Sequence, residues 1–284
     1  MAVLDWLVRK KQDPKAALTN VLGEYALPSF PVVVLRALSV LRDPKSSSAD
    51  IAKQVAIDPG VSTKLLSVAN SSALALRSKV KNVDHAVSLL GRGEVESLLL
   101  GFAVRGTLPS APGPGFNPTR FWQTAAKRAT LARAIADLGD RANRSESFTA
   151  SLLQDMAIPL LVKVHANVYG PVLENWHAGS HELAPSEEGQ FGWNHAHVAG
   201  WLCTNWKFPE ALSQSIAAHH DEAMGAIPKG VALVASLRET DDDQAILRIA
   251  ELASQQMNLD LRRVQDALGD ALTNAAEIAG QFSR

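Results

Sequence analysis

The sequence predicts an all-α protein, and three observations support this fold class. Apolar residues recur at the three- and four-residue spacing of an amphipathic helix over most of the 284 positions. No segment alternates apolar and polar residues as a half-buried strand does, and no Asn-Gly hairpin turn occurs. Helix-capping residues, prolines and glycines separate the periodic segments at short intervals. Together these features predict a multi-helix fold made of short helices joined by tight turns.

The first group of predicted helices lies between residues 32 and 106, and local signals fix where each helix begins or ends. A proline in the first turn is tolerated because its missing N–H would have no helical partner there, while Ser, Asp and Asn side chains accept the free N–H groups of that turn. The predicted helices are 32–41, which ends at Asp43-Pro44; one opened by a capping box of Ser47 and Asp50; one opened by Asp58-Pro59; one that follows Asn82 and ends at Gly91; and 93–106.

A break in the helical pattern is predicted at Leu108–Pro118, because this segment holds four prolines and two glycines. We expect it to separate two helical subdomains that pack as one body. Beyond it the pattern predicts helices at 119–138, 146–166, 194–206, 209–220, 228–239, 243–257 and 261–282, while 178–193 is richer in polar and loop-forming residues. The expected divisions are an N-terminal helical extension (1–19), a first helical subdomain (20–107), a linker loop (108–118), a second subdomain (119–222) and C-terminal helices that pack on the core (223–284).

Composition restricts the classes of function. Lys and Arg number 28 against 29 Asp and Glu, so the net charge of −1 lacks the basic excess of most nucleic-acid-binding proteins. The single cysteine, Cys203, excludes an intrachain disulfide and fits a reducing compartment. Its apolar surroundings predict an inert thiol. No apolar run reaches the roughly 20 residues of a membrane span, so we expect a cytoplasmic protein.

The segment Met1–Lys11 is amphipathic, with its apolar residues ahead of its basic ones, which is the reverse of a secretory signal. One interpretation is a helix that lies on a membrane surface. The favoured interpretation is that Trp6 and Leu7 pack on the folded body, since leaving them in water would forfeit about 1.5–3 kcal/mol each.

Five of the eight histidines lie close together in the sequence, at His181, His195, His197, His219 and His220. Neutral imidazole is a common metal ligand. Residues that are adjacent or two apart on a helix do not share a face, however, so the favoured interpretation is caps or core side chains, with a metal site as the alternative. No P-loop, nucleophile elbow or zinc-spaced cysteine pair occurs. The run Asp241-Asp242-Asp243 is predicted to be a solvated turn with a helix N-cap.

A series of short blocks, taken in order, carries a resemblance to a known family. The blocks are Leu27–Pro31, Ile57–Leu66, Val68–Ser71, Ala86–Gly91, Phe121-Trp122, Ser151–Asp155, Phe191–Gly200, Trp206–Glu210 and Ala218–His220. They resemble the HDOD family, the HD-related output domains of bacterial signalling, over about residues 20–222. The resemblance implies an all-α HD-like fold, in which a helical N-terminal subdomain packs on a degenerate version of the HD metallophosphohydrolase core.

The resemblance also implies where an active HD enzyme would hold its metal ligands, and several are missing. The position similar to the first histidine holds Thr124, the His-Asp pair reads Gln154-Asp155, and the final aspartate is replaced near Ala235-Ser236. The vestigial candidates that remain are Asp155, His195, His219 and His220. A hydrolytic metal site must position a nucleophilic water and neutralise phosphate charge, so these losses predict no catalytic residue, no bound metal and no cofactor. Asp155 is then expected to accept hydrogen bonds from Gln154, Thr124 or His195.

The sequence therefore favours a non-catalytic signal-transduction module that acts through protein–protein contacts or a sensed ligand, without nucleic acid or a membrane span. A receiver, a kinase or a cyclic-dinucleotide enzyme acting in trans is the expected kind of partner. The helices of residues 20–107 are the expected contact surface, with Arg36, Arg42 and Lys53 at its rim; alternatively, these helices only bury one another. The alternative function is a metal-dependent HD-type phosphohydrolase of a nucleotide or cyclic dinucleotide, which would use the four vestigial candidates.

Overall fold

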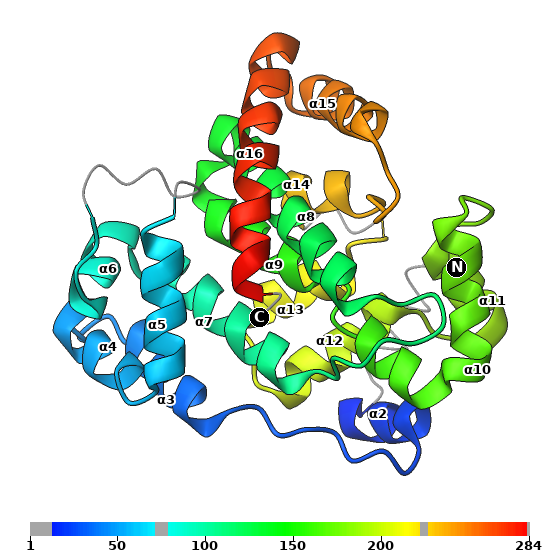
Figure 1. Ribbon diagram of the computed structural model, residues 1–284, viewed down its shortest axis with the longest axis horizontal. Helices are drawn as coiled ribbons and strands as arrows, with labels where there is room; N and C mark the ends of the chain where they lie inside the picture. Colours follow the sequence, from blue (N-terminus) through cyan, green and yellow to red (C-terminus); the bar gives the residue numbers. More distant parts are fainter. Residues whose placement is uncertain (1–12, 72–78, 222–226, 283–284) are drawn as a thin grey trace.

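The computed structural model describes residues 13–71, 79–221 and 227–282, and Figure 1 shows their arrangement. Within those ranges the regular elements are helices, apart from an isolated bridge between Gly113 and Phe116. The predicted all-α fold class is confirmed. The prediction that Trp6 and Leu7 pack on the body concerns Met1–Lys11, which lies outside the described residues.

The first half of the described chain contains α2 (Pro14–Leu22), α3 (Val32–Arg42), α4 (Ser48–Val55), α5 (Pro59–Ala69), α6 (Val83–Leu90) and α7 (Arg92–Thr107). Capping contacts confirm the predicted boundaries. Ser47 and Asp50 form the capping box of α4, and Asp58 accepts from two N–H groups in the first turn of α5. Gly91, between α6 and α7, has a φ of 79°, which residues with a Cβ rarely adopt.

Helix α2 stands apart from the other helices of the first half. The segment 23–31 runs from α2 to α3 across the molecule, while α3 to α6 gather at one side (Figure 1). α2 packs instead against α12 (His195–Asn205) of the second half. The boundary expected between residues 19 and 20 falls inside α2, so the first half contacts the second half through this separate helix as well as through α7.

The second half contains the remaining described helices, two of which have their predicted bounds. They are α8 (Pro118–Gly139), η2 (Arg141–Asn143), α9 (Arg144–Leu153), α10 (Ile158–His177), α11 (Leu183–Phe191), α12, α13 (Glu210–Ala217), α14 (Lys229–Val234), α15 (Asp243–Met257) and α16 (Leu261–Phe282). The predictions for 243–257 and 261–282 are confirmed, and Asp242 caps α15 as expected for the acidic run. α16 lies along α8 (Figure 1).

The helix predicted at 228–239 ends at Val234, and two further predictions for the second half are wrong. The helix predicted at 146–166 is two helices separated by a turn at 154–157, since Pro159 in the first turn of α10 would break a continuous helix. The segment 178–193, predicted as polar and loop-forming, contains α11. This helix buries only Leu183, Ala184 and Glu187, so its apolar face is too narrow to stand out as a periodic pattern. Both corrections matter because Asp155 lies in the turn and Glu187 lies on α11.

One apolar core joins the two halves. It includes Leu38 and Leu98 from the first half and Phe148 and Ile216 from the second. The loop at 108–118 lies on α10, because Gly170 leaves room for Pro114, whose Cβ would be 2.4 Å from an added Cβ at that glycine. The loop is therefore a packed connection.

The stretch Arg141–His177, which contains α9 and α10, is apolar enough over one window to cross a membrane by length and composition alone. Of that window, 61% is buried inside the fold. The turn at 154–157 also interrupts the stretch. Its apolar side chains are thus accounted for by packing in the core.

Gly230 allows α14 to lie directly on α8. A Cβ at this position would come within 2.6 Å of the backbone carbonyl oxygen of Ala132. We expect Gly230→Ala to lower the free energy of unfolding by about 1–3 kcal/mol, as overpacking does, when it is measured by urea denaturation. Gly269→Ala in α16 is the control, because nothing lies within 4 Å of its added methyl, and it should stabilise by about 0.5–1 kcal/mol. Equal effects of the two substitutions would contradict this role of Gly230.

Candidate functional site

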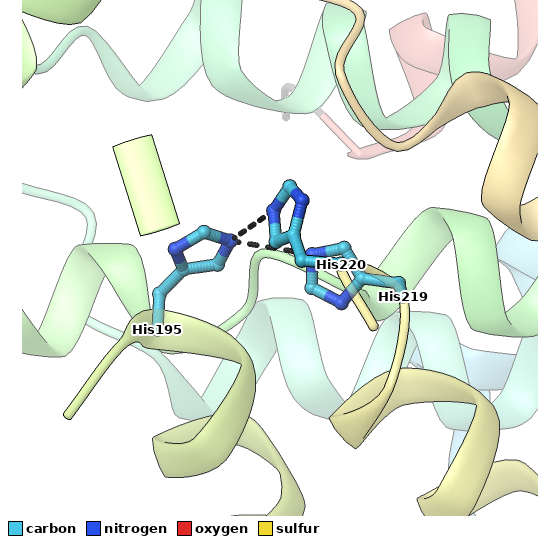
Figure 2. A group of neighbouring side chains, drawn as sticks. All are labelled: His195, His219 and His220. Carbon is cyan, nitrogen blue, oxygen red and sulfur yellow. Dashed lines mark hydrogen bonds between the residues drawn. The ribbon is translucent and has the colours of Figure 1, made fainter. Parts of the chain in front are cut away.

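Three of the predicted histidines meet in the interior of the second half. His195 begins α12, and His219 and His220 follow the end of α13 (Figure 2). The Nε2 atom of His195 lies 3.2 Å from Nε2 of His219 and 3.1 Å from Nε2 of His220. One ligand atom from each of the three histidines lies within 4.8 Å of the others. The structure therefore brings His195 into contact with the adjacent pair His219 and His220, which follow it by 24 and 25 residues.

The expectation that His219 and His220 cannot face one site is wrong. α13 ends at Ala217, so the two residues lie in a turn and helical spacing does not govern their directions. The other two histidines of the predicted group lie elsewhere. His197 completes the capping box of Asn194, and His181 is exposed.

Asp155, from the turn between α9 and α10, faces the histidines. Its Oδ1 lies 3.4 Å from Nε2 of His195 and 3.5 Å from Nε2 of His219. Its Oδ2 forms an ion pair with Nη1 of Arg128, from α8. Burial alone would raise the pKa of Asp155, but Arg128 and the histidines outweigh burial and hold this pKa well below its ordinary value. Asp155 is therefore a buried carboxylate that is charged at neutral pH.

Sequence reasoning did not identify Arg128, although it is the main counter-ion of Asp155. Its side chain is almost fully buried, and its Nε donates at 2.9 Å to the carbonyl oxygen of Leu237, which also accepts from its Nη2. Arg128 comes one helical turn after Thr124 in the sequence. The sequence offered one signal for this ion pair, which is an arginine among the apolar residues of a predicted core helix. A buried arginine nearly always has a charged partner.

Glu187 lies at the other ring nitrogen of His195, and it was not predicted from the sequence either. This fully buried residue of α11 accepts from the backbone N–H of His195 at 3.0 Å, lies 2.6 Å from its Nδ1, and accepts from the hydroxyl of Tyr169. Burial alone would lower the pKa of His195, but Glu187 and Asp155 together raise it to about 10. Burial also raises the pKa of Tyr169 well above its ordinary value, and Glu187 adds to that rise.

The charges of this cluster balance. Arg128 and protonated His195 are positive, and Asp155 and Glu187 are negative. Burial lowers the pKa of both His219 and His220, so these two are neutral. The Nδ1 of His219 lies 2.7 Å from the carbonyl oxygen of Ile216 and is its donor, which leaves the lone pair of Nε2 facing His195. We call these residues, with Tyr169, the ionic cluster: Arg128, Asp155, Tyr169, Glu187, His195, His219 and His220.

The other positions that the sequence singled out make different contacts. Of the three expected donors to Asp155, His195 places its Nε2 3.4 Å from Oδ1. Gln154 instead donates from Nε2 at 3.3 Å to the carbonyl oxygen of Ala235. Thr124 lines a small cavity beside Asp155. Cys203 is buried, and burial raises the pKa of its thiol, as an inert cysteine requires.

The space beside Asp155 is very small. The cavity has a volume of about 10 Å³, and Arg128, His177 and Glu239 are among its lining residues. That is room for about one water molecule. A nucleotide or cyclic dinucleotide does not fit there unless the surrounding helices move.

Glu239 gives this cavity an expected pH dependence. Burial raises its pKa from 4.5 to about 7, although Arg128 and Arg120 oppose that rise and Asp155 adds to it. Between about pH 4.5 and pH 7 the unfolded chain ionises at this residue and the folded protein does not, so stability falls as the pH rises through that range. The loss should be on the order of 1–2 kcal/mol, because the group is partly solvated.

Urea denaturation of the wild type and of Glu239→Gln from pH 4.5 to 7.5 tests this expectation. Their stability difference should change in favour of the glutamine variant as the pH rises. Glu251→Gln, at an exposed position of α15, is the control and should give a flat difference. A flat difference for Glu239→Gln would show that burial does not perturb this carboxyl.

The comparison with family models identifies one family. The model of the HDOD domain matches residues 27–222. A protein of Treponema pallidum (strain Nichols) without a described function is 21% identical over 201 residues, which are 69% of this chain. The chain spans 38% of the length of that curated relative.

Solved structures show the same fold. A protein of Shewanella amazonensis SB2B, provisionally described as a phosphohydrolase, has a TM-score of 0.73 at 23% identity, with 94% of this chain and 98% of that one covered. An HDOD domain protein of unknown function from Geobacter sulfurreducens has a TM-score of 0.65 at 20% identity, with 91% and 98% covered. A protein of Marinobacter aquaeolei VT8, provisionally described as a signal transduction protein, has a TM-score of 0.70 at 21% identity, with 96% and 66% covered.

Proposed function

The chain belongs to the HDOD domain family, and from this membership and the ionic cluster we propose that it is a non-catalytic signal-transduction module that binds a protein partner. The observation that carries the non-catalytic part is the position of Arg128. Its guanidinium holds the carboxylate of Asp155, the one acidic metal ligand that the resemblance to HD enzymes leaves in place. A metal ion at Asp155 would have to share that carboxylate with a fixed positive charge.

Two further features support the absence of hydrolysis. The cavity of about 10 Å³ leaves no space for a phosphate ester beside Asp155. The charges are already balanced by Arg128 and His195, so a divalent ion that displaced the proton of His195 would leave an excess positive charge in the interior. The cluster is thus suited to hold α8, α9, α11, α12 and α13 together.

Exposed apolar side chains of the first half support a protein partner. Val32, Ile57 and Leu89 have exposed fractions of 60%, 56% and 42%. They lie at the start of α3, just after α4 and on α6, and α4 packs against both α3 and α6. Contiguous exposed apolar groups mark contact surfaces, and we propose that these three side chains belong to one such surface. The partner that we propose is a receiver, a kinase or a cyclic-dinucleotide enzyme acting in trans.

The polar rim expected around this surface needs one correction. Arg42 is paired with Glu96, its Nε lying 2.7 Å from a carboxylate oxygen, so it is not a free rim charge. Arg36 and Lys53 remain exposed, and Lys53 is 3.9 Å from Asp50 in a weak pair. Arg92 donates to the carbonyl oxygens of Leu41 and Asp43 at the end of α3.

Capture from the native cell extract with the full chain as bait tests the partner assignment. The wild type and Leu252→Asp should retain the same signalling protein, because Leu252 is an exposed leucine of α15 in the second half. Ile57→Asp should lose at least about tenfold of the captured amount, since a charge would be buried in the interface. Equal retention by Ile57→Asp and Leu89→Asp, or loss only in Leu252→Asp, would contradict a partner on the first half.

The second candidate function is a metal-dependent phosphohydrolase, and one observation favours it. A tetrahedral zinc ion with bonds of about 2.0–2.1 Å places its ligands about 3.3 Å apart. The Nε2 of His195 lies 3.2 and 3.1 Å from the Nε2 atoms of His219 and His220, and the Oδ1 of Asp155 lies 3.4 and 3.5 Å from those of His195 and His219, which is near this value. The three histidines would hold such an ion, with Asp155 as the candidate fourth ligand, and the ion would supply Lewis acid chemistry. Arg128 and the closed cavity argue against turnover even then.

A further inference from the structure

Two of the family blocks contribute no residue to the ionic cluster, and they contact each other elsewhere in the fold. Leu27–Pro31 lies between α2 and α3, and Trp206–Phe208 follows α12. The ring of Phe30 has its centroid 5.3 Å from those of both Trp206 and Phe208. The indole N–H of Trp206 donates at 3.3 Å to the carbonyl oxygen of Pro28. These contacts fix the segment 23–31 on the second half.

A pocket of about 480 Å³ opens beside these contacts. Its walls come from α2, from the segment 23–31 and from the end of α12, and Leu35 of α3 also lines it. Leu18, Leu22 and Leu27 give it apolar walls, and the hydroxyl-bearing Tyr25 also lines it. The volume is in the range of pockets that hold small organic molecules, and such pockets occur where separate parts of a fold meet.

The charged residues that line this pocket are of one sign. Lys15 lies on α2 and Lys207 follows α12, and no carboxylate side chain is among the described residues that line the pocket. Among the described residues neither lysine makes an ion pair. Two ammonium groups beside an apolar cavity favour an anionic ligand.

The backbone at Lys207 supports a role for this side chain. Its φ of 59° lies in the left-handed region, where glycine is unstrained and a residue with a Cβ is not. This conformation ends α12 in a Schellman motif, in which the N–H groups of Lys207 and Phe208 donate to the carbonyl oxygens of Thr204 and Cys203. Glycine is the usual residue at this position, so a lysine there fits a need for its charge.

We propose that this pocket binds a small organic anion with an apolar body, such as a carboxylate or sulfonate joined to an aromatic ring or an alkyl chain. The body lies against Leu18, Leu22 and Leu27, and the anionic group lies between Lys15 and Lys207. A bound molecule touches α2, the segment 23–31 and α12 together, so it stabilises the connection between the two halves. This inference does not depend on the protein partner proposed above.

The probe for this site is 8-anilinonaphthalene-1-sulfonate, whose fluorescence rises in an apolar site. The full chain should bind one equivalent, and decanoate, an alkyl carboxylate, should displace it. N-phenyl-1-naphthylamine, the same ring system without the sulfonate, should bind at least about fivefold more weakly, since it lacks the attraction to the two lysines.

Two pairs of variants localise the binding. Thr19→Trp puts an indole into the pocket and should weaken binding at least about tenfold, whereas Thr63→Trp should leave it unchanged. Thr19 and Thr63 are both exposed helix residues whose hydroxyls donate to the carbonyl four residues earlier. Lys207→Gly removes the charge and relieves the backbone, and should weaken binding about fivefold, while Lys163→Met, at an exposed position of α10, should not.

The outcomes separate the possibilities. Loss of binding in Thr19→Trp and Lys207→Gly, with both controls unchanged, supports the site. Binding that Thr19→Trp leaves intact would place the probe elsewhere and overturn the proposal. Binding that ignores both Lys207→Gly and the removal of the sulfonate would overturn the assignment to an anion. No binding of either probe to the wild type would overturn the whole inference.

Discussion

Arg128→Met is expected to lower the free energy of unfolding by about 3–5 kcal/mol, the usual result of removing one partner from a buried ion pair. Methionine keeps much of the volume of the arginine but leaves the carboxylate of Asp155 with the histidines alone, in a site that is only 4% exposed. The carbonyl oxygen of Leu237 also loses the donors that Arg128 provides. Urea denaturation at pH 7 measures this loss.

A double-mutant cycle isolates the pair from the change in packing. Arg128→Met with Asp155→Leu removes both charges, so the double variant should be at least about 2 kcal/mol more stable than the sum of the single losses predicts. Arg144→Met is the control for an exposed pair, because Arg144 lies 3.5 Å from Asp137 at the surface, and it should cost less than about 1 kcal/mol. Additive losses at Arg128 and Asp155 would contradict the coupling.

Glu187→Gln is expected to cost about 2–4 kcal/mol at pH 7, since it removes the charge that stabilises the imidazolium of His195 while leaving the shape of the side chain unchanged. Nitrogen NMR of the imidazole rings reports the protonation directly. In the wild type at pH 8 His195 should be an imidazolium, because Glu187 and Asp155 raise its pKa to about 10. In Glu187→Gln a large fraction of the molecules should have a neutral His195 ring at pH 8.

Glu182→Gln provides the comparison for this variant. Glu182 pairs with Arg238 at 2.9 Å, but its side chain is 60% exposed, so the substitution should cost less than about 1 kcal/mol. A neutral His195 in the wild type at pH 8, or an unchanged imidazolium in Glu187→Gln, would refute the charge balance of the ionic cluster.

The elements that could be predicted from the sequence are those governed by contacts within a few residues. The capping box of Ser47 and Asp50 and the glycine stop at Gly91 depend on the chain immediately around them. The strong apolar face of 261–282 likewise shows directly in the spacing of its residues. The order of the family blocks identified the fold, because several weak local similarities become specific when they occur in the same order along the chain.

The contacts that define the ionic cluster could not be predicted in the same way. Arg128 meets Asp155 across 27 residues only because α8 packs on α9 and the helix predicted at 146–166 breaks at 154–157. Glu187 belongs to α11, whose few buried residues gave no periodic signal. The convergence of His219 and His220 depends on where α13 ends, and helix ends are set by tertiary packing as much as by local residues.

The central claim is that Arg128 and His195 hold Asp155 in a closed, non-hydrolytic cluster, and a turnover assay tests it most directly. The full chain, loaded with Mn²⁺ or Zn²⁺ and freed of unbound ions, is assayed with bis(p-nitrophenyl) phosphate, with a nucleotide and with a cyclic dinucleotide. We predict the same rate as in buffer for the wild type and for Asp155→Asn. Hydrolysis of any of these substrates that depends on the bound metal and disappears in Asp155→Asn would contradict the account.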